Sequence, residues 1–210
     1  SLTEDFIDFT RFENEKGLPI NKQFINIKDF FNEINNIFSF QAEEKDLRFD
    51  INMAPDVPET IWTDPKRMKQ VLLNLLSNSF KFTQRGKIEI NLLVKKGVLD
   101  NQVNHFIDMS EFHEGKSLIK GSLIDTKVTS LESTLISKRP EDEKFLTEEE
   151  DQRRYLFIEV VDTGLGMDEK DRKELFTKFG TGKNSRGLNT NGLGLGLYLS
   201  KEIWLKLGGD

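Results

Sequence analysis

The sequence predicts a mixed α/β domain, and three observations carry that prediction. Segments with the two-residue period of a half-buried strand alternate with segments of helical period along most of the chain. One segment, 67–83, is apolar around most of a helical circumference, so it should lie against a core with a single polar stripe left over. Glycine-rich loops follow the last strand and precede the last helix.

The expected elements of the first half follow one another closely. Asp64 and Pro65 should open the helix 67–83, as an N-cap followed by proline at the first helical position. Glycine and proline mark the turns between the other segments. In order, we expect the end of an amphipathic helix (1–14), a short strand (24–27), a helix (30–45), a half-buried strand (47–51), the helix 67–83 and a strand (88–94).

The second half contains a long break in this pattern. Residues 95–154 are rich in Ser, Thr, Lys, Glu and Asp with scattered apolar residues, so we expect a disordered or loosely ordered surface insert. A β-branched and aromatic strand should follow over 155–161, then a short helix around 170–176. The last helix should run over 194–207 and end at Gly208 and Gly209.

Composition narrows the class of protein. With 36% hydrophobic and 31% charged residues, the chain of 210 residues reads as globular and soluble. A formal charge of -6 argues against general affinity for nucleic acid. The absence of cysteine excludes disulfides and thiol catalysis, and it makes a cytosolic location the simplest expectation. His105 and His113 fit solvated loop residues best. Because the chain begins without methionine, we expect it to be a fragment.

The helix 67–83 carries an unusual polar stripe. At about 100° per residue, five polar side chains lie within roughly 80° of one another. Asparagine is a poor residue in the middle of a helix, so two of them one turn apart call for a reason. A solvated stripe would normally use Glu, Lys or Arg, which leaves a wall of a ligand site as the sharper hypothesis. The stripe consists of Arg67, Gln70, Asn74, Asn78 and Lys81.

Asp162 opens a glycine-rich turn, Asp162-Thr163-Gly164-Leu165-Gly166, directly after a strand that should be buried. The glycines let the backbone approach a ligand or take positive φ. A carboxylate at such a strand end can accept a hydrogen bond from an exocyclic amine such as that of adenine. An ordinary Asx turn explains the same residues equally well.

The second glycine-rich motif, Gly192-Leu193-Gly194-Leu195-Gly196, leads into the last helix and could hold phosphate oxygens. Alone it is a weak signal. No strand precedes it, as a dinucleotide site would require, and the chain contains no P-loop motif. The polar loop before it, 180–191, contains Lys183 and Arg186 and could fold over a nucleotide, or it could be a solvated linker.

Four segments resemble, in order, the N, G1, F and G2 boxes of the catalytic ATP-binding domain of sensor histidine kinases: NLLSNSFKFT, DTGLGM, LFTKF and NGLGLGL. Sensor histidine kinases belong to the GHKL superfamily. Together they are much more specific than any one alone. The resemblance implies an α/β (α+β) two-layer sandwich of the Bergerat type, in which a mixed sheet is covered on one face by three main helices. It also implies that 1–18 end a dimerisation helix and that 19–210 form the ATP-binding domain, with its last strand truncated.

The resemblance assigns a role to each motif. Asn78 would coordinate Mg2+, with amide oxygen as a hard neutral ligand. Asp162 would bind the adenine amine, Gly164 and Gly166 would shape the adenine site, and Arg186 would reach the phosphates from the lid. The remaining implied nucleotide contacts are Asn74, Lys81, Phe82, Gly192, Gly194 and Gly196.

The implied activity is transfer of the γ-phosphoryl group of ATP to a histidine upstream of Ser1. The implied partners are ATP, the chain's own dimerisation domain in a homodimer, and the receiver domain of a response regulator. In the ATP-hydrolysing branch of the superfamily a glutamate, which activates water, stands at the position of Asn74. An amide cannot act as a general base. Hydrolysis, or a catalytically silent regulatory domain, is therefore the alternative function.

Overall fold

The structure, a computed structural model, describes Ile7, Phe9, Thr10 and residues 18–96, 117–123, 154–167, 175–177 and 195–208. Ile7, Phe9 and Thr10 are helical, in agreement with the helix predicted over 1–14. No helix in these ranges is long and apolar enough to cross a membrane.

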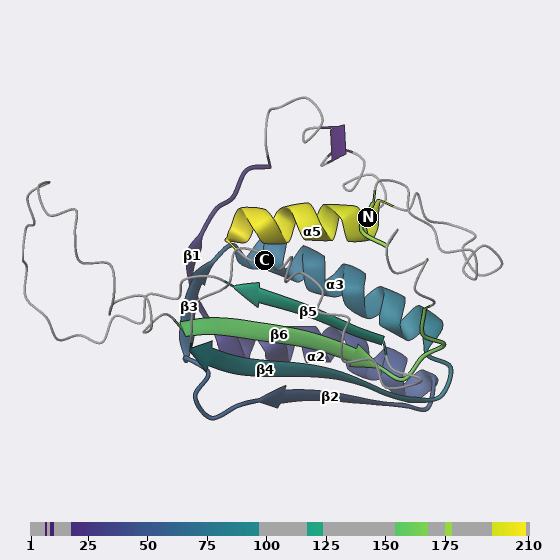
Figure 1. The fold of residues 1–210 in the computed structure, drawn as a ribbon. Helices are drawn as coiled ribbons and strands as arrows, with labels where there is room; N and C mark the ends of the chain where they lie inside the picture. The colour runs from purple at the N-terminus through teal and green to yellow at the C-terminus, as the bar shows by residue number, and fades with distance from the viewer. Residues whose placement is uncertain are drawn as a thin grey trace, which may run out of the picture.

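A four-stranded mixed sheet forms one layer of the fold (Figure 1). Its strands lie in the order β2-β4-β6-β5. β2 runs parallel to β4, whereas β4 with β6 and β6 with β5 are antiparallel. The mixed sheet predicted above is thus confirmed. The strands are β2 (Leu47–Met53), β4 (Gly86–Lys96), β5 (Ser117–Leu123) and β6 (Arg154–Asp162).

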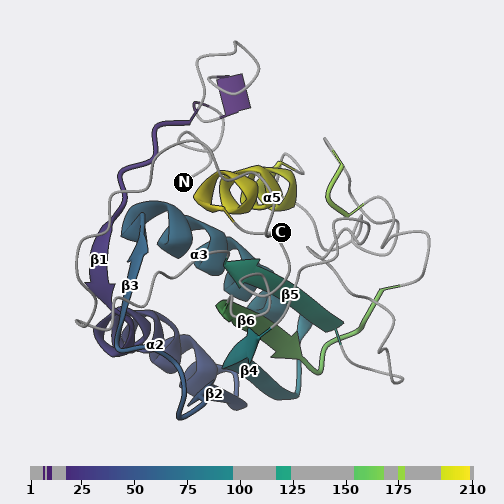
Figure 2. The ribbon, with the colours of Figure 1, turned by 60° about the vertical axis from the view of Figure 1, so that its left-hand side comes forward.

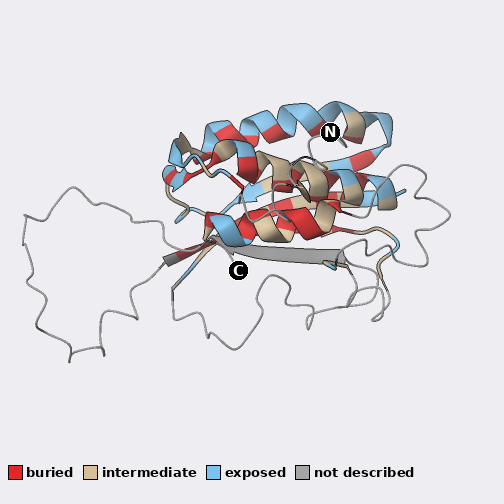
Figure 3. Ribbon diagram, turned by 90° about the horizontal axis from the view of Figure 1, so that it is seen from above, coloured by how far each residue is buried: buried red, intermediate tan, exposed pale blue. Residues whose placement is uncertain are grey.

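The other layer consists of α2 (Ile27–Glu44), α3 (Pro65–Phe82) and α5 (Gly196–Leu207), which cover the same face of the sheet (Figures 1 and 2). The strands alternate accordingly, because successive side chains point to opposite faces. In β4, Ile88 and Ile90 are fully buried, whereas the intervening Glu89 is half-buried. Figure 3 shows the same division on the helices, with buried residues toward the sheet and exposed residues outward. The predicted two-layer sandwich is confirmed.

A core of aromatic rings ties two helices to the sheet. Phe38 of α2 stacks on Phe80 of α3 with ring centroids 5.1 Å apart and planes at 12°. Phe49 of β2 meets Phe80 edge-on at 5.6 Å. Phe80 is fully buried. It therefore fixes the C-terminal half of α3, where the polar stripe ends, against both other elements.

The predicted helix ends are confirmed. Asp64 Oδ1 accepts a hydrogen bond from Arg67 N at 3.1 Å, so Asp64 is the N-cap of α3, and Pro65 takes the first helical position. Gly208 ends α5 with φ 93°, a left-handed conformation that favours glycine.

A short antiparallel ribbon of β1 (Gln23–Asn26) and β3 (Thr60–Thr63) stands apart from the main sheet. β3 was not predicted, because four residues between a proline turn and the N-cap of α3 are too few to establish a period. Ile61 is buried beneath the ribbon, whereas Trp62 is 49% exposed and lies beside Phe24, with ring centroids 4.7 Å apart.

The expectation that the whole of 95–154 is a disordered or loosely ordered insert is wrong for Ser117–Leu123, which form β5 and pair with β6. Pairing with an existing strand can hold a segment whose own sequence pattern is weak, since the partner supplies the backbone hydrogen bonds. The helix predicted around 170–176 lies mostly outside the described residues, and Leu175 and Phe176 are in a turn.

Candidate functional site

The polar stripe of α3 divides along its length. Arg67, in the first turn, is only 7% exposed, and its guanidinium donates to Gln70 Oε1 at 2.8 Å. Asn74 and Asn78 are half-buried, and Lys81 is exposed. Arg67 is therefore occupied by contacts within the fold, whereas Asn78 and Lys81 are partly or fully exposed to solvent.

A buried carboxylate lies beside the C-terminal end of α3. Asp162, the last residue of β6, is 6% exposed. Its Oδ2 accepts a hydrogen bond from Ser79 Oγ at 3.1 Å, and its Oδ1 accepts one from Gly164 N at 3.0 Å. Burial raises the pKa of Asp162 above its ordinary value, and these hydrogen bonds oppose the rise. Such a group is a strong acceptor for a donor that reaches it, because water does not compete.

Thr83 completes what we name the carboxyl cluster: Asp162, Ser79, Thr83 and Gly164. Its hydroxyl is close enough to the carboxyl of Asp162 to lower that group's pKa. Nevertheless Thr83 Oγ1 is buried without a well-formed hydrogen bond to any residue that the structure describes. An unsatisfied buried hydroxyl costs free energy, so Thr83 Oγ1 is a candidate partner for a ligand or an ordered water.

Sequence analysis missed Ser79 and Thr83 as site residues. Ser79 lies outside the polar stripe of the helix, in agreement with its burial, yet it donates a hydrogen bond to Asp162. The available signal was their spacing of four residues, which puts two hydroxyls on one side of α3 and its C-cap.

The turn after β6 packs onto the end of α3. A Cβ at Gly164 would lie 2.8 Å from Phe82 O and 2.9 Å from Asp162 Oδ1, so this close approach requires glycine. Leu165 N donates to Phe82 O at 3.3 Å. Gly166 has φ 68° and faces open space, so its conformation rather than crowding favours glycine. The predicted glycine turn therefore joins Asp162 to the helix that bears Asn78.

The side chain of Asn74 points to α5. Asn74 Nδ2 donates a hydrogen bond to Ser200 Oγ at 2.8 Å. Gly196 lies against the same carboxamide, where a Cβ would come within 3.1 Å of Asn74 Cγ. The structure thus brings Asn74 and Gly196 together, as the predicted nucleotide site requires, but by direct contact. Their contact with a nucleotide stays a prediction.

Asn78 and Lys81 fit the phosphate and metal end of such a site. Mg2+ usually takes one or two protein oxygen ligands and completes its octahedron with phosphate oxygens and water, so a single half-buried amide oxygen is a suitable donor. Lys81 Nζ lies 5.2 Å from the centroid of the Phe82 ring, which keeps its charge at the end of α3. The Mg2+ contact of Asn78 and the nucleotide contacts of Lys81 and Phe82 stay predictions.

Three predicted site residues, Arg186, Gly192 and Gly194, lie outside the described residues, as does Lys183 of the polar loop. The structure describes the chain again from Leu195, which is buried at the start of α5. The predicted lid is therefore untested, whereas its C-terminal attachment at α5 is described.

Comparisons with known proteins bear on the family and the fold of the chain. Residues 130–210 match the family model described as histidine kinase-, DNA gyrase B-, and HSP90-like ATPase. This range includes Asp162 and Gly196 but not α3. Two similar relatives are the signal transduction histidine-protein kinase BarA of Escherichia coli (strain K12) and the probable histidine kinase 6 of Oryza sativa subsp. japonica. Each is 25% identical over the whole of this chain, which spans 17% and 23% of their lengths.

Among solved structures, the fold is similar to the crystal structure of full-length ShkA in complex with AMPPNP. The TM-score is 0.57 at 18% sequence identity, over 99% of this chain and 30% of the other. The sandwich is thus the fold of a histidine kinase-type ATP-binding domain. The whole chain is thus similar to sensor histidine kinases, and its C-terminal part, 130–210, matches the histidine kinase-, DNA gyrase B-, and HSP90-like ATPase family.

Proposed function

We propose that this chain is the ATP-binding catalytic domain of a two-component sensor histidine kinase and takes part in transfer of the γ-phosphoryl group of ATP to a histidine upstream of Ser1. One observation carries the proposal furthest. A buried carboxylate with an unsatisfied hydroxyl beside it lies next to the end of the helix that bears Asn78 and Lys81.

Adenine would be recognised at the carboxyl cluster. Asp162 can accept a hydrogen bond from the exocyclic amine, and the Thr83 hydroxyl can take a ring nitrogen or an ordered water as its partner. Guanine has a carbonyl oxygen where adenine has its amine, so it would set an acceptor against the buried acceptor and leave Asp162 unpaired. Selectivity for adenine over guanine is therefore expected, because unpaired buried polar groups are costly.

The phosphates would lie toward Asn78 and Lys81. Mg2+, when bound, bridges phosphate oxygens and offsets their negative charge. Asn78 would supply an amide oxygen to the ion, and Lys81 would bring a positive charge to the phosphates. Gly192, Gly194 and Gly196, with Arg186, would enclose them from the lid, as the family resemblance implies.

In the transfer step the bond from the γ-phosphorus to the bridging oxygen breaks, a bond from phosphorus to a histidine nitrogen forms, and ADP leaves. Positioning and charge stabilisation, rather than a protein base, would supply most of the rate. Asn74 cannot accept the proton of a water molecule, and its amide nitrogen is bonded to Ser200. Hydrolysis is therefore the weaker alternative.

The proposal includes its partners and its setting. Residues 1–18 would be the end of the dimerisation helix of a homodimer, and 19–210 the catalytic domain. The phosphorylated histidine would pass its group to a receiver domain of a response regulator. The domain would work in the cytosol, where ATP is available.

A calorimetric titration of the 210-residue chain with Mg-ATP tests the metal assignment. Asn78→Ala should lower the affinity by at least about tenfold, because it removes a metal ligand. Asn36→Ala, at an exposed asparagine of α2, is the matched control and should bind as the wild type does. Equal Mg2+ dependence in Asn78→Ala and wild type would refute the assignment.

The test of activity uses a longer protein that includes the proposed acceptor histidine. We expect label from [γ-32P]ATP to appear on that histidine, and Asn78→Ala to abolish it. Steady release of phosphate without labelled protein would favour an ATPase. Nucleotide binding with neither product would indicate a catalytically silent regulatory domain.

A further inference from the structure

A polar contact joins the two helices on either side of the predicted phosphate end of the site. Asn74 of α3 and Ser200 of α5 are 126 residues apart in sequence and 2.8 Å apart at Asn74 Nδ2 and Ser200 Oγ. Ser200 is 2% exposed. A hydrogen bond between such groups defines one relative position of the helices, because breaking it would leave a buried polar atom unpaired.

Gly196 fits the same carboxamide from the other side. It precedes Ser200 by four residues, so both lie on the face of α5 toward α3. A Cβ at Gly196 would lie 3.1 Å from Asn74 Cγ, 3.2 Å from Asn74 Nδ2 and closer still to Asn74 Oδ1. The Asn74 side chain therefore lies against the bare Cα of Gly196, and it could not keep this position against an alanine.

The contact with Asn74 explains why residue 196 is glycine, without a ligand. Gly196 begins α5 in a helical conformation, so its backbone angles do not demand glycine. The family resemblance implies that residue 196 is glycine because phosphates lie close to it. The structure shows that the side chain of Asn74 leaves no room for a Cβ there. The two explanations predict different effects of Gly196→Ala when Asn74 is replaced by alanine.

The first turn of α5 has no side-chain N-cap. Leu195, at the N-cap, makes no side-chain hydrogen bond to the first turn. Asn74 precedes Asn78 by one helical turn on the same face of α3. A carboxamide that holds Gly196 and Ser200 therefore fixes the start of α5 relative to Asn78.

We infer that Asn74, Gly196 and Ser200, which we name the α3–α5 latch, set the position of the phosphate-binding end of α5, and that Ser200 is a positioning residue for Mg-ATP. The effect on Mg-ATP rests on the proposed function, whereas the latch contact itself does not. In this role Asn74 affects Mg-ATP binding indirectly, by setting the position of α5.

The first experiment measures thermal unfolding of the 210-residue chain without nucleotide. Alanine is the better helix former, so Gly196→Ala should raise Tm by about 2–4 °C where there is room for the methyl group. We expect that rise in the Asn74→Ala background and a fall in Tm where Asn74 is present. The same change of Tm in both backgrounds would overturn the latch.

The second experiment measures ATP and ADP affinities by calorimetry with and without Mg2+. Ser200→Ala should reduce the Mg2+-dependent gain in ATP affinity by about 5- to 10-fold and leave ADP binding without Mg2+ within about twofold of wild type. Ser200→Thr keeps the hydroxyl and should retain most of the gain, even where its extra methyl lowers Tm. Ser77→Ala, at an exposed serine of α3, is the control.

A lower Tm for Ser200→Ala with the full Mg2+-dependent gain would reduce Ser200 to a structural residue and overturn its positioning role. The proposed function fails separately, if the wild-type chain binds no adenine nucleotide. Wild-type binding that is sensitive to Asp162→Ala but not to Ser200→Ala would keep the proposed function and overturn the inference.

Discussion

Two regions of the molecule lie at the same stretch of α3 but differ in what surrounds them. One is the carboxyl cluster, and the other is the amide end of the site, by which we mean Asn78 and Lys81. In the cluster, Asp162, Ser79 and Thr83 are all buried, and the hydrogen bonds within the fold already orient the carboxylate. At the amide end, Asn78 is half-buried and Lys81 is exposed. The fold therefore orients the proposed acceptor for a base in advance, whereas the proposed metal and phosphate end is more open to solvent.

The largest effect on the free energy of unfolding is expected at Phe80, which packs beneath both regions. Phe80 follows Ser79 and precedes Lys81, and it is fully buried between Phe38 and Phe49. Phe80→Ala should lower the free energy of unfolding by about 3–5 kcal/mol, since it removes a large side chain and leaves a cavity. Urea denaturation measures this loss.

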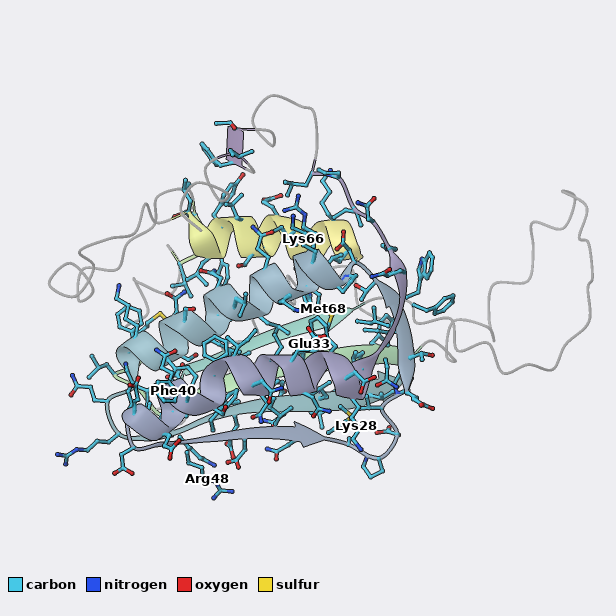
Figure 4. All side chains as sticks on the ribbon, turned by 180° about the vertical axis from the view of Figure 1, so that it is seen from behind. Lys28, Glu33, Phe40, Arg48, Lys66 and Met68 are labelled. Atoms are coloured by element: carbon cyan, nitrogen blue, oxygen red, sulfur yellow. The ribbon has the colours of Figure 1, made fainter. Side chains whose placement is uncertain are left out.

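Phe40→Ala is the matched control. Phe40 lies on the outer face of α2 (Figure 4), where it is 67% exposed, so its loss should change the free energy of unfolding by less than about 0.5 kcal/mol. Similar losses in the two variants would mean that the aromatic core does not support the site.

The second effect separates binding from stability at the carboxyl cluster. The pKa of Asp162 is raised above its ordinary value of 3.8 by burial. Folding therefore favours the protonated carboxyl: its contribution to stability is full below the ordinary pKa and is lost as pH rises through the raised pKa. Asp162→Asn resembles the protonated form, so at pH 7 its Tm should equal or exceed that of wild type, and the difference should shrink as pH falls toward 3.8.

The same variant should bind ADP about tenfold more weakly, because a neutral acceptor forms a weaker hydrogen bond than a carboxylate. Asp56→Asn, at an exposed aspartate in the turn before β3, should change neither property. A lower Tm for Asp162→Asn at pH 7 would show that the ionised carboxylate stabilises the fold, contrary to the effect expected from its burial.

The difference between the two regions also explains what could be predicted from sequence. The apolar faces of α2 and α3 follow helical periods, and Asp162 stands beside glycines at a strand end, so both were predictable from local pattern. The bonds from Ser79 to Asp162 and from Asn74 to Ser200 join residues 83 and 126 positions apart. No local pattern encodes such a pairing, and β3 and β5 escaped prediction because pairing with another strand defines them.

A smaller effect is expected at the N-terminal end of α3, far from both regions. Asp64 caps the helix through Arg67 N, and its Oδ2 also accepts a hydrogen bond from Asn21 N at 2.7 Å. Asp64→Ala should lower the free energy of unfolding by about 1–2 kcal/mol, the usual cost of losing an N-cap. Asp64→Asn keeps an acceptor oxygen for one of these donors and should lose less.

Nucleotide affinity of the folded Asp64 variants should stay within about twofold of wild type, since the cap acts on the helix and not on the ligand. Calorimetry at a temperature well below Tm measures it. A selective loss of Mg-ATP affinity would show that the two ends of α3 are coupled, and the contrast between the regions would then extend along the whole helix.

The smallest effect on stability is expected at Lys81, and it tests whether the amide end depends on its ligand. The exposed Lys81 ammonium lies over the Phe82 ring, a contact that contributes about 0.5–1 kcal/mol at most. Lys81→Met should therefore hardly change unfolding, whereas ATP affinity at low salt should fall severalfold more than ADP affinity, because ATP brings more negative charge. The difference should shrink at about 0.5 M salt, where charges are screened over a few ångströms.

Lys66→Met is the matched control, at an exposed lysine in the first turn of α3 (Figure 4). It makes the same change of charge away from the amide end, so it should leave both affinities unaltered. Equal losses in the two variants would attribute the effect to net charge, and the amide end would lose its assigned phosphate contact.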